Sequence, residues 1–129
     1  MMTEAKLKRL AQKWQRILRL QDWDIEIAPV QAEHVDRQAG NTALCERQVN
    51  EHAATIPIAM MQQDKEIVED MVHELLHVKL TPLELLYRNV RQLVGPIASN
   101  LAESCWDDID EPLVSELAHA LLEVHGYGD

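Results

Sequence analysis

Apolar residues recur at helical spacing along the first twenty residues. Placed at 100° per residue they share one side of a helix, and they are Leu7, Leu10, Ala11, Trp14, Ile17 and Leu18. Thr3 precedes them and carries the hydroxyl group of a good N-cap. The pattern predicts an amphipathic helix over residues 4–20.

The stretch QDWDIEIAPV switches to period two, because apolar and acidic side chains alternate along WDIEI. The alternation predicts a half-buried strand, which we expect to stop near Pro29. The polar residues 31–42 are expected to form a loop, with a turn at Gly40-Asn41.

Two more short strands are expected over about residues 42–48 and 52–59, turning around Asn50-Glu51. Pro57 lies in the second of them and has no N–H to donate to a neighbouring strand, which indicates an edge position. We therefore predict a short antiparallel sheet.

Helical spacing resumes at Asp64 and continues to about Leu80. The residues TPLE, 81–84, fit a capping box with proline at the first helical position. Three further helices are expected over about 82–94, 97–106 and 111–125, the last two separated by the acidic turn WDDIDEP. The order of one helix, a short antiparallel sheet and then helices predicts an α+β fold, with residues 1–129 as a single domain.

Charge and composition narrow the class of protein. The formal net charge of −10 argues against a nucleic-acid backbone as the main partner, although six Lys and Arg side chains in residues 1–20 make that segment basic. Cys45 and Cys105 are far apart and lack the spacing of a thiolate metal site. Since no apolar stretch is long enough for a membrane span or a signal peptide, we expect a cytoplasmic protein.

The stretch DMVHELLHVKL holds the most informative pattern in the chain. On a helix, Asp70, His73, Glu74 and His77 fall within an arc of about 100°, while apolar residues fill most of the remaining circumference. Two neutral imidazoles four residues apart can bind one zinc ion, and the glutamate between them can act on a water without ligating the metal. His73, Glu74 and His77 are therefore predicted to form a metal site with its own general base.

A catalytic zinc site needs a third protein ligand. The last predicted helix offers Glu111, Glu116 and His119, and the residues alone do not choose among them. Asp70 lies a full turn before His73 and is better suited to accept a hydrogen bond from an imidazole N–H.

These residues give the chain a resemblance to a known family. VHELLH, followed about thirty residues later by DEPLVSELAHALL, resembles the small gluzincin-type zinc metallopeptidases, including phage and prophage HExxH proteins and ImmA/IrrE-like domains. In the latter, a helix reading roughly E-x-x-A-N-x-F-A-x-x-L-L supplies the third zinc ligand through its first glutamate. That glutamate falls on Glu111, whereas Ser115 and Leu117 replace the Asn and the Phe.

The resemblance implies a zincin-like fold and a Zn²⁺ ion held by His73, His77 and Glu111, although such sites accept several divalent ions. It also implies a peptide or protein substrate that pairs with the strand preceding the motif helix. We therefore expect a zinc metallopeptidase with Glu74 as general base and acid.

Two alternatives remain open. One is a zinc-binding regulatory or interaction module of the same fold that cleaves nothing efficiently, since the chain is small and no residue stands out as the oxyanion donor. Candidates for that donor are Tyr87, His119, His125 and Tyr127. The other alternative is a structural domain without metal. Because His34 and His52 lie in loop or strand contexts, we expect plain polar roles for them.

Overall fold

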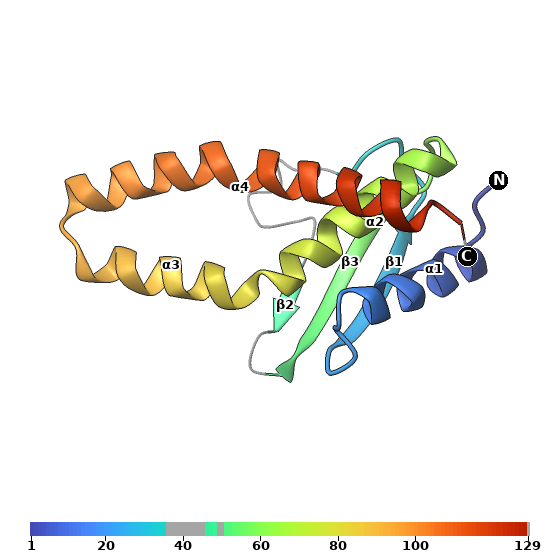
Figure 1. Cartoon of the computed structure of the whole chain (residues 1–129), viewed down its shortest axis with the longest axis horizontal. Coiled ribbons are helices and arrows are strands. Elements are labelled where there is room, and N and C mark those ends of the chain that lie inside the picture. Colours follow the sequence, from blue (N-terminus) through green and yellow to red (C-terminus); the bar gives the residue numbers. More distant parts are fainter. Residues whose placement is uncertain (36–45, 49–50, 129) are drawn as a thin grey trace.

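The computed structural model describes residues 1–35, 46–48 and 51–128. Within them the chain forms four helices and three strands (Figure 1). In chain order these are α1 (Glu4–Ile17), β1 (Asp24–Val30), β2 (Glu46–Gln48), β3 (Ala53–Ala59), α2 (Asp64–Lys79), α3 (Thr81–Leu93) and α4 (Pro96–His125). The predicted α+β class is confirmed. The predicted turn at Gly40-Asn41, the start of the second strand and Cys45 lie outside the described residues.

The sheet differs from the prediction in the direction of its strands. Its order is β1-β3-β2, and β1 pairs with β3 in parallel along their full lengths. Only the three-residue β2 is antiparallel to β3. The prediction of an antiparallel sheet is therefore wrong for its main pair, because alternating side chains determine which face is buried but not the direction of the neighbouring strand.

Both strand prolines are placed where a missing N–H does no harm. The N–H of Asp24 donates to the carbonyl of His52 and that of Met60 to Val30, so alternate residues of β1 and β3 face each other. By this alternation Pro29 and Pro57 point their nitrogens away from the β1–β3 ladder. β1 ends at Val30, directly after Pro29, as predicted. The predicted edge position of Pro57 is wrong for the strand as a whole, because β3 is the central strand of the described sheet, although Pro57 lies beyond the residues of β3 that pair with β2.

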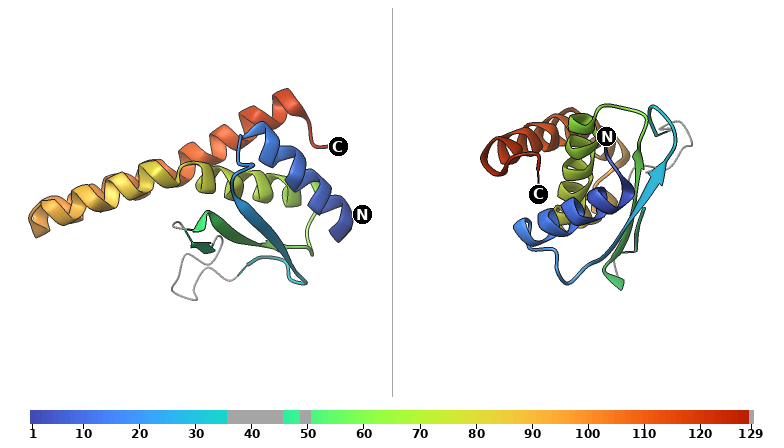
Figure 2. Two further views of the ribbon diagram at one scale, coloured as in Figure 1. Left: turned by 90° about the horizontal axis from the view of Figure 1, so that it is seen from below. Right: turned by 90° about the vertical axis from the view of Figure 1, so that its right-hand side faces the viewer.

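Helix α2 lies between the sheet and α4, while α1 covers the same face of the sheet beside α2 (Figure 2). This position explains why α2 is apolar around most of its circumference. Its fully or nearly buried apolar residues are Ile67, Val68, Met71, Val72, Leu75, Leu76 and Val78. The predicted amphipathic helix at the N-terminus is also present, and the hydroxyl of Thr3 accepts from the N–H of Lys6 as an N-cap does.

The junction between α2 and α3 is tighter than the predicted capping box. Thr81 is buried and lies inside α3, and its hydroxyl donates back to the carbonyl of His77. The cap position falls on Leu80, which also ends α2. Thr81 is already helical and the N–H of Glu84 donates to the carbonyl of Leu80, so the two helices follow each other almost without a break.

The last two predicted helices are a single helix. α4 runs from Pro96 to His125 through Pro112, and the predicted acidic turn WDDIDEP is helical. Contacts on both sides of Pro112 hold the helix in place: Trp106 stacks on Tyr87 of α3, and Val114, Ala118 and Leu122 are buried. With α3 it forms a hairpin that projects beyond the sheet (Figure 1). No helix among the described residues is long and apolar enough to cross a membrane.

Candidate metal centre

Helix α2 supplies three of the four predicted site residues. At the start of α2 the carboxylate of Glu66 accepts a hydrogen bond from the N–H of Gln63. Packing of α2 against the sheet and against α4 fixes the rotation of the helix about its axis. His73 and His77 turn their side chains to one edge of the buried helix, where they are 15 % and 14 % exposed. Glu74 is 5 % exposed, so the structure places a carboxyl group inside the protein beside two imidazoles.

Glu111 of α4 reaches both imidazoles at once. Its Oε2 lies 2.9 Å from Nε2 of His73 and its Oε1 lies 2.9 Å from Nε2 of His77. The two Nε2 atoms are 3.1 Å apart. A long-range contact thus brings together the four residues that the sequence singled out.

These three side chains fit a tetrahedral metal ion. Ligand atoms held 2.0–2.1 Å from a tetrahedral zinc ion lie about 3.3–3.4 Å from one another. The observed separations are a few tenths of an ångström shorter, so a small outward movement of the side chains accommodates an ion. Two overlapping sets of described residues also have ligand atoms close enough to share an ion: His73, Glu74 and His77, and His77, Asp110 and Glu111.

The charges of the site favour an ionised third ligand. Hydrogen bonds from His73 and His77 hold the pKa of the Glu111 carboxyl far below its usual range. Burial alone would lower the pKa of His77, but the hydrogen bond and charge of Glu111, with the charges of Glu74 and Asp110, outweigh burial and raise it. A proton and a metal ion therefore compete for His77, as expected of a metal-binding imidazole.

Glu74 differs from Glu111 in its surroundings. Burial raises the pKa of its carboxyl, and the rings of His77 and His73 oppose this shift only in part. The pKa of Asp110 is raised as well, mainly by burial. The site thus holds one carboxylate that stays ionised, Glu111, and one carboxyl that takes up a proton more readily, Glu74, and such a division is typical of acid–base chemistry.

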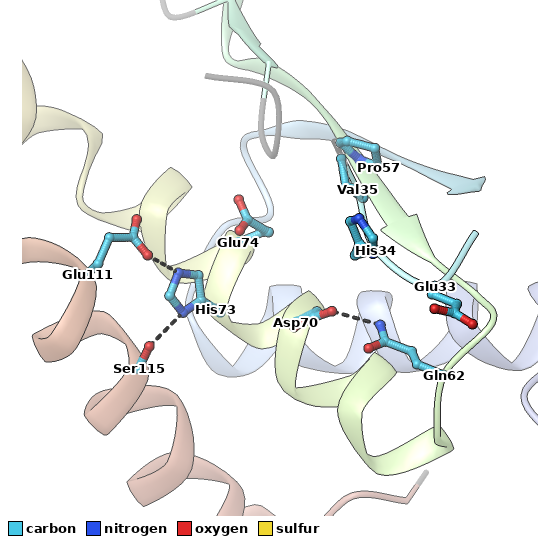
Figure 3. Close-up of a pocket in the computed structure, with 10 residues that line it drawn as sticks. All are labelled: Glu33, His34, Val35, Pro57, Gln62, Asp70, His73, Glu74, Glu111 and Ser115. Carbon is cyan, nitrogen blue, oxygen red and sulfur yellow. Dashed lines mark hydrogen bonds and ion pairs between the residues drawn. The ribbon is translucent and has the colours of Figure 1, made fainter. Parts of the chain in front are cut away.

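Ser115 contacts the imidazole ring of His73 at its second nitrogen, Nδ1. Its hydroxyl lies 3.3 Å from Nδ1, on the side of the ring opposite Glu111 (Figure 3). When Nε2 keeps its lone pair for a metal ion, Nδ1 carries the proton and donates it to this hydroxyl. We expected Asp70 to accept from an imidazole, but its carboxylate accepts from Gln62 instead.

A cavity of about 320 Å³ opens beside the imidazoles. Its described lining comes from α2, α4, the end of β3 and the segment after β1: Glu33, His34, Val35, Pro57, Gln62, Asp70, His73, Glu74, Glu111 and Ser115 (Figure 3). The volume is at the lower end of the range for ligand pockets, which is room for a short segment of a substrate.

The other candidates lie elsewhere. Glu116 is exposed on α4, and His119 is 3.7 Å from the carboxylate of Glu69. Tyr127 donates to Glu69, His125 packs against the ring of Trp14, and Tyr87 stacks on Trp106. Of the three carboxylate and imidazole candidates in the last helix, the structure brings only Glu111 to the motif.

Sequence reasoning missed three residues of the site. Ser115 follows Glu111 by four residues, so the rule that such residues share a helix face was the signal for it. Asp110 adjoins Glu111 and was read as part of a turn. His34 lines the cavity from a loop, and nothing in its spacing indicated this position.

Comparison of the chain with protein-family models, with curated proteins and with solved structures found no match in any of the three. The resemblance to gluzincin-type metallopeptidases therefore stays a prediction from the motif.

Proposed function

We propose that the protein is a metal-dependent hydrolase of peptide bonds, with zinc as the metal. The proposal depends on one observation: Nε2 of His73, Nε2 of His77 and the carboxylate of Glu111 converge within 2.9–3.1 Å beside a buried carboxyl group. His73, His77 and Glu111 would hold the ion. A zinc ion bound there would supply Lewis-acid chemistry toward water and the scissile carbonyl group.

Glu74 carries the proton in this proposal. As a carboxylate it accepts a proton from the attacking water, whose oxygen bonds to the carbonyl carbon. It then returns that proton to the amide nitrogen, which leaves as an amine when the C–N bond breaks. The raised pKa of Glu74 supports this role, because a carboxyl that holds its proton more firmly is a better base.

The position of the cavity supports a peptide substrate. Pro57 at the end of β3 and His34 and Val35 after β1 lie across the cavity from His73 and Glu74 (Figure 3). A substrate segment that reaches the imidazoles would therefore lie in this cavity, between the segment after β1 and the polar edge of α2.

A second candidate function is a metal-binding regulatory module without efficient catalysis. One observation favours it: none of the four expected oxyanion donors, Tyr87, His119, His125 and Tyr127, is among the described residues that line the cavity. His34 lines the cavity across from His73, and His34→Ala in the digestion experiment below measures its contribution.

Digestion of a peptide library by the zinc-loaded protein separates these functions. We expect cleavage by the parent protein and a loss of roughly a hundredfold to ten-thousandfold in Glu74→Gln, because removal of a general base raises the barrier by about 3–5 kcal/mol. Glu74→Gln should keep one zinc per chain, and the exposed Glu116→Gln on α4 is the matched control with parental rates. Cleavage by Glu74→Gln at the parental rate would rule out the mechanism, and no cleavage by any variant would favour the regulatory module.

A further inference from the structure

Helix α3 carries an apolar stripe that the described part of the chain leaves uncovered. The stripe consists of Leu83, Leu86, Val90 and Leu93, and Leu86 and Leu93 are 60 % and 86 % exposed. Successive members are three, four and three residues apart, which is the spacing of the contact positions in a coiled coil. Such spacing on an exposed helix predicts a partner helix.

The partner is not α4 of the same chain, which packs against a different side of α3. Tyr87 stacks on Trp106, and Arg91 binds Ser99 and Glu103 of α4. At 100° per residue, the stripe is turned by roughly 100° away from these contacts. The closure of the hairpin therefore leaves the stripe exposed.

Helix α4 extends the apolar surface on the same side of the hairpin. Ile109 and Leu113 are exposed and lie roughly 60° from the side of α4 that faces α3, turned in the same sense of rotation as the stripe. Because α3 and α4 are antiparallel, rotations of the same sense bring both sets of side chains onto one flank. We call this surface, formed by Leu83, Leu86, Val90, Leu93, Ile109 and Leu113, the hairpin flank.

The hairpin flank differs from the rest of the molecule in charge. None of its six residues is charged, although the chain has a net charge of −10. By the same helical rotation Arg88, Asp107 and Asp108 point to other sides of the hairpin. Two copies can therefore meet along these six residues without burying a charge, and Glu116, which lies on the same side of α4 one turn beyond Leu113, marks the end of the flank.

We propose that the hairpin flank binds a second copy of the chain, so that two hairpins form a four-helix bundle about a twofold axis. A single helical peptide would cover the stripe on α3 or the residues on α4, whereas the flank is two helices wide. The hairpin of a second copy has that width and the same apolar pattern, and a twofold axis requires such a self-complementary surface.

The size of the surface suits a weak dimer. The 13 residues of α3 extend about 20 Å, and two adjacent helices are about 20 Å wide. Two such faces bury roughly 800 Å² in total, which is below the size of stable interfaces and in the range of weak, transient ones. We therefore expect dissociation in roughly the micromolar range.

Dimer formation leaves the candidate metal centre open. Glu111 is about 160° around α4 from Leu113, so the cavity and the hairpin flank lie on opposite sides of the helix. The dimer should consequently form equally in the presence of zinc and of a chelator, and its test does not depend on the proposed enzymatic function.

Sedimentation velocity of the full chain, from about 1 to about 200 µM, tests the proposal. We expect the parent protein to move from the monomer mass of 14.8 kDa towards twice that value. Leu86→Glu should weaken the dimer at least tenfold, because each copy would bury an unpaired charge in the interface. Leu85→Glu is the matched control: Leu85 is exposed on the other side of α3, and this variant should dimerise like the parent.

Circular dichroism shows whether Leu86→Glu folds. If it does not, Leu93→Glu at the tip of the hairpin serves as the second test variant. A parent protein that is monomeric throughout the range would overturn the proposal, as would folded Leu86→Glu and Leu93→Glu proteins that dimerise like the parent. A monomer that sediments with phosphatidylcholine vesicles would also overturn it and would assign the flank to a lipid surface.

Discussion

At the scale of single residues, the same spacing rules explain the parts of the site that could be predicted and those that could not. His73, Glu74 and His77 are close in sequence, so a helix alone brings them together, as predicted. Glu111 had two competitors in its own helix; the spacing rules left all three open, the resemblance favoured Glu111, and the packing of α4 on α2 brings Glu111 to the imidazoles. His34 comes from a loop, for which periodicity makes no prediction.

Ser115 should affect metal binding through the ring of His73. We expect Ser115→Ala to weaken zinc affinity roughly tenfold while the fold is unchanged, because outer partners of ligating histidines contribute 10–100-fold. Competition with a chromophoric chelator measures the affinity. Glu116→Ala changes the next residue, which is exposed, and should bind zinc like the parent; equal affinities in all three proteins would exclude this role of Ser115.

In the metal-free protein at neutral pH, the ionised Glu74 side chain should lower the free energy of unfolding. Burial raises the pKa of Glu74 in the folded protein above its pKa in the unfolded chain. The protonated carboxyl therefore stabilises the folded state at low pH, and this stabilisation is lost as the pH rises through the folded-state pKa. At neutral pH the neutral Glu74→Gln should therefore be more stable than the parent, by about 0.5–2 kcal/mol.

Urea unfolding in the presence of chelator measures this difference. The advantage of Glu74→Gln should shrink as the pH is lowered and Glu74 takes up its proton. A variant that is less stable than the parent at neutral pH, or an advantage that grows on acidification, would contradict the assigned protonation.

At the scale of elements, the type of each helix and strand followed from periodicity, whereas directions and ends did not. The parallel pairing of β1 and β3 is a contact between distant segments, and the side-chain pattern does not specify the relative direction of two strands. The continuity of α4 depends on Tyr87 and on α2, which pack on either side of Pro112. Local sequence favours a break there, and tertiary contacts overcome that preference.

Pro112 should reduce the stability of α4. Its ring removes the hydrogen bond to the carbonyl of Asp108, and it lies inside the helix rather than in the first turn. We expect Pro112→Ala to stabilise the protein by roughly 1–3 kcal/mol in thermal unfolding. Pro96→Ala at the start of the same helix is the control and should change little; a destabilised Pro112→Ala protein would show that the proline fits its surroundings better than alanine.

At the scale of the whole molecule, the candidate metal centre connects two parts with different roles. Helix α2 belongs to the core on the sheet, whereas α4 begins in the projecting hairpin and reaches α2 only in its second half (Figure 1). An ion shared by His73, His77 and Glu111 would therefore link the core to the base of the hairpin. The α+β class could be predicted from the order of periodic segments, but this link depends on a contact between residues 38 positions apart.

The central claim is that His73, His77 and Glu111 hold one divalent ion, and a crystal structure of the zinc-loaded protein with anomalous scattering at the zinc edge tests it most directly. We predict one peak about 2.0–2.2 Å from Nε2 of each histidine and from a carboxylate oxygen of Glu111, with Glu74 beyond bonding distance. The absence of a peak between the two rings, or a peak bonded to Glu74 in place of Glu111, would contradict the claim.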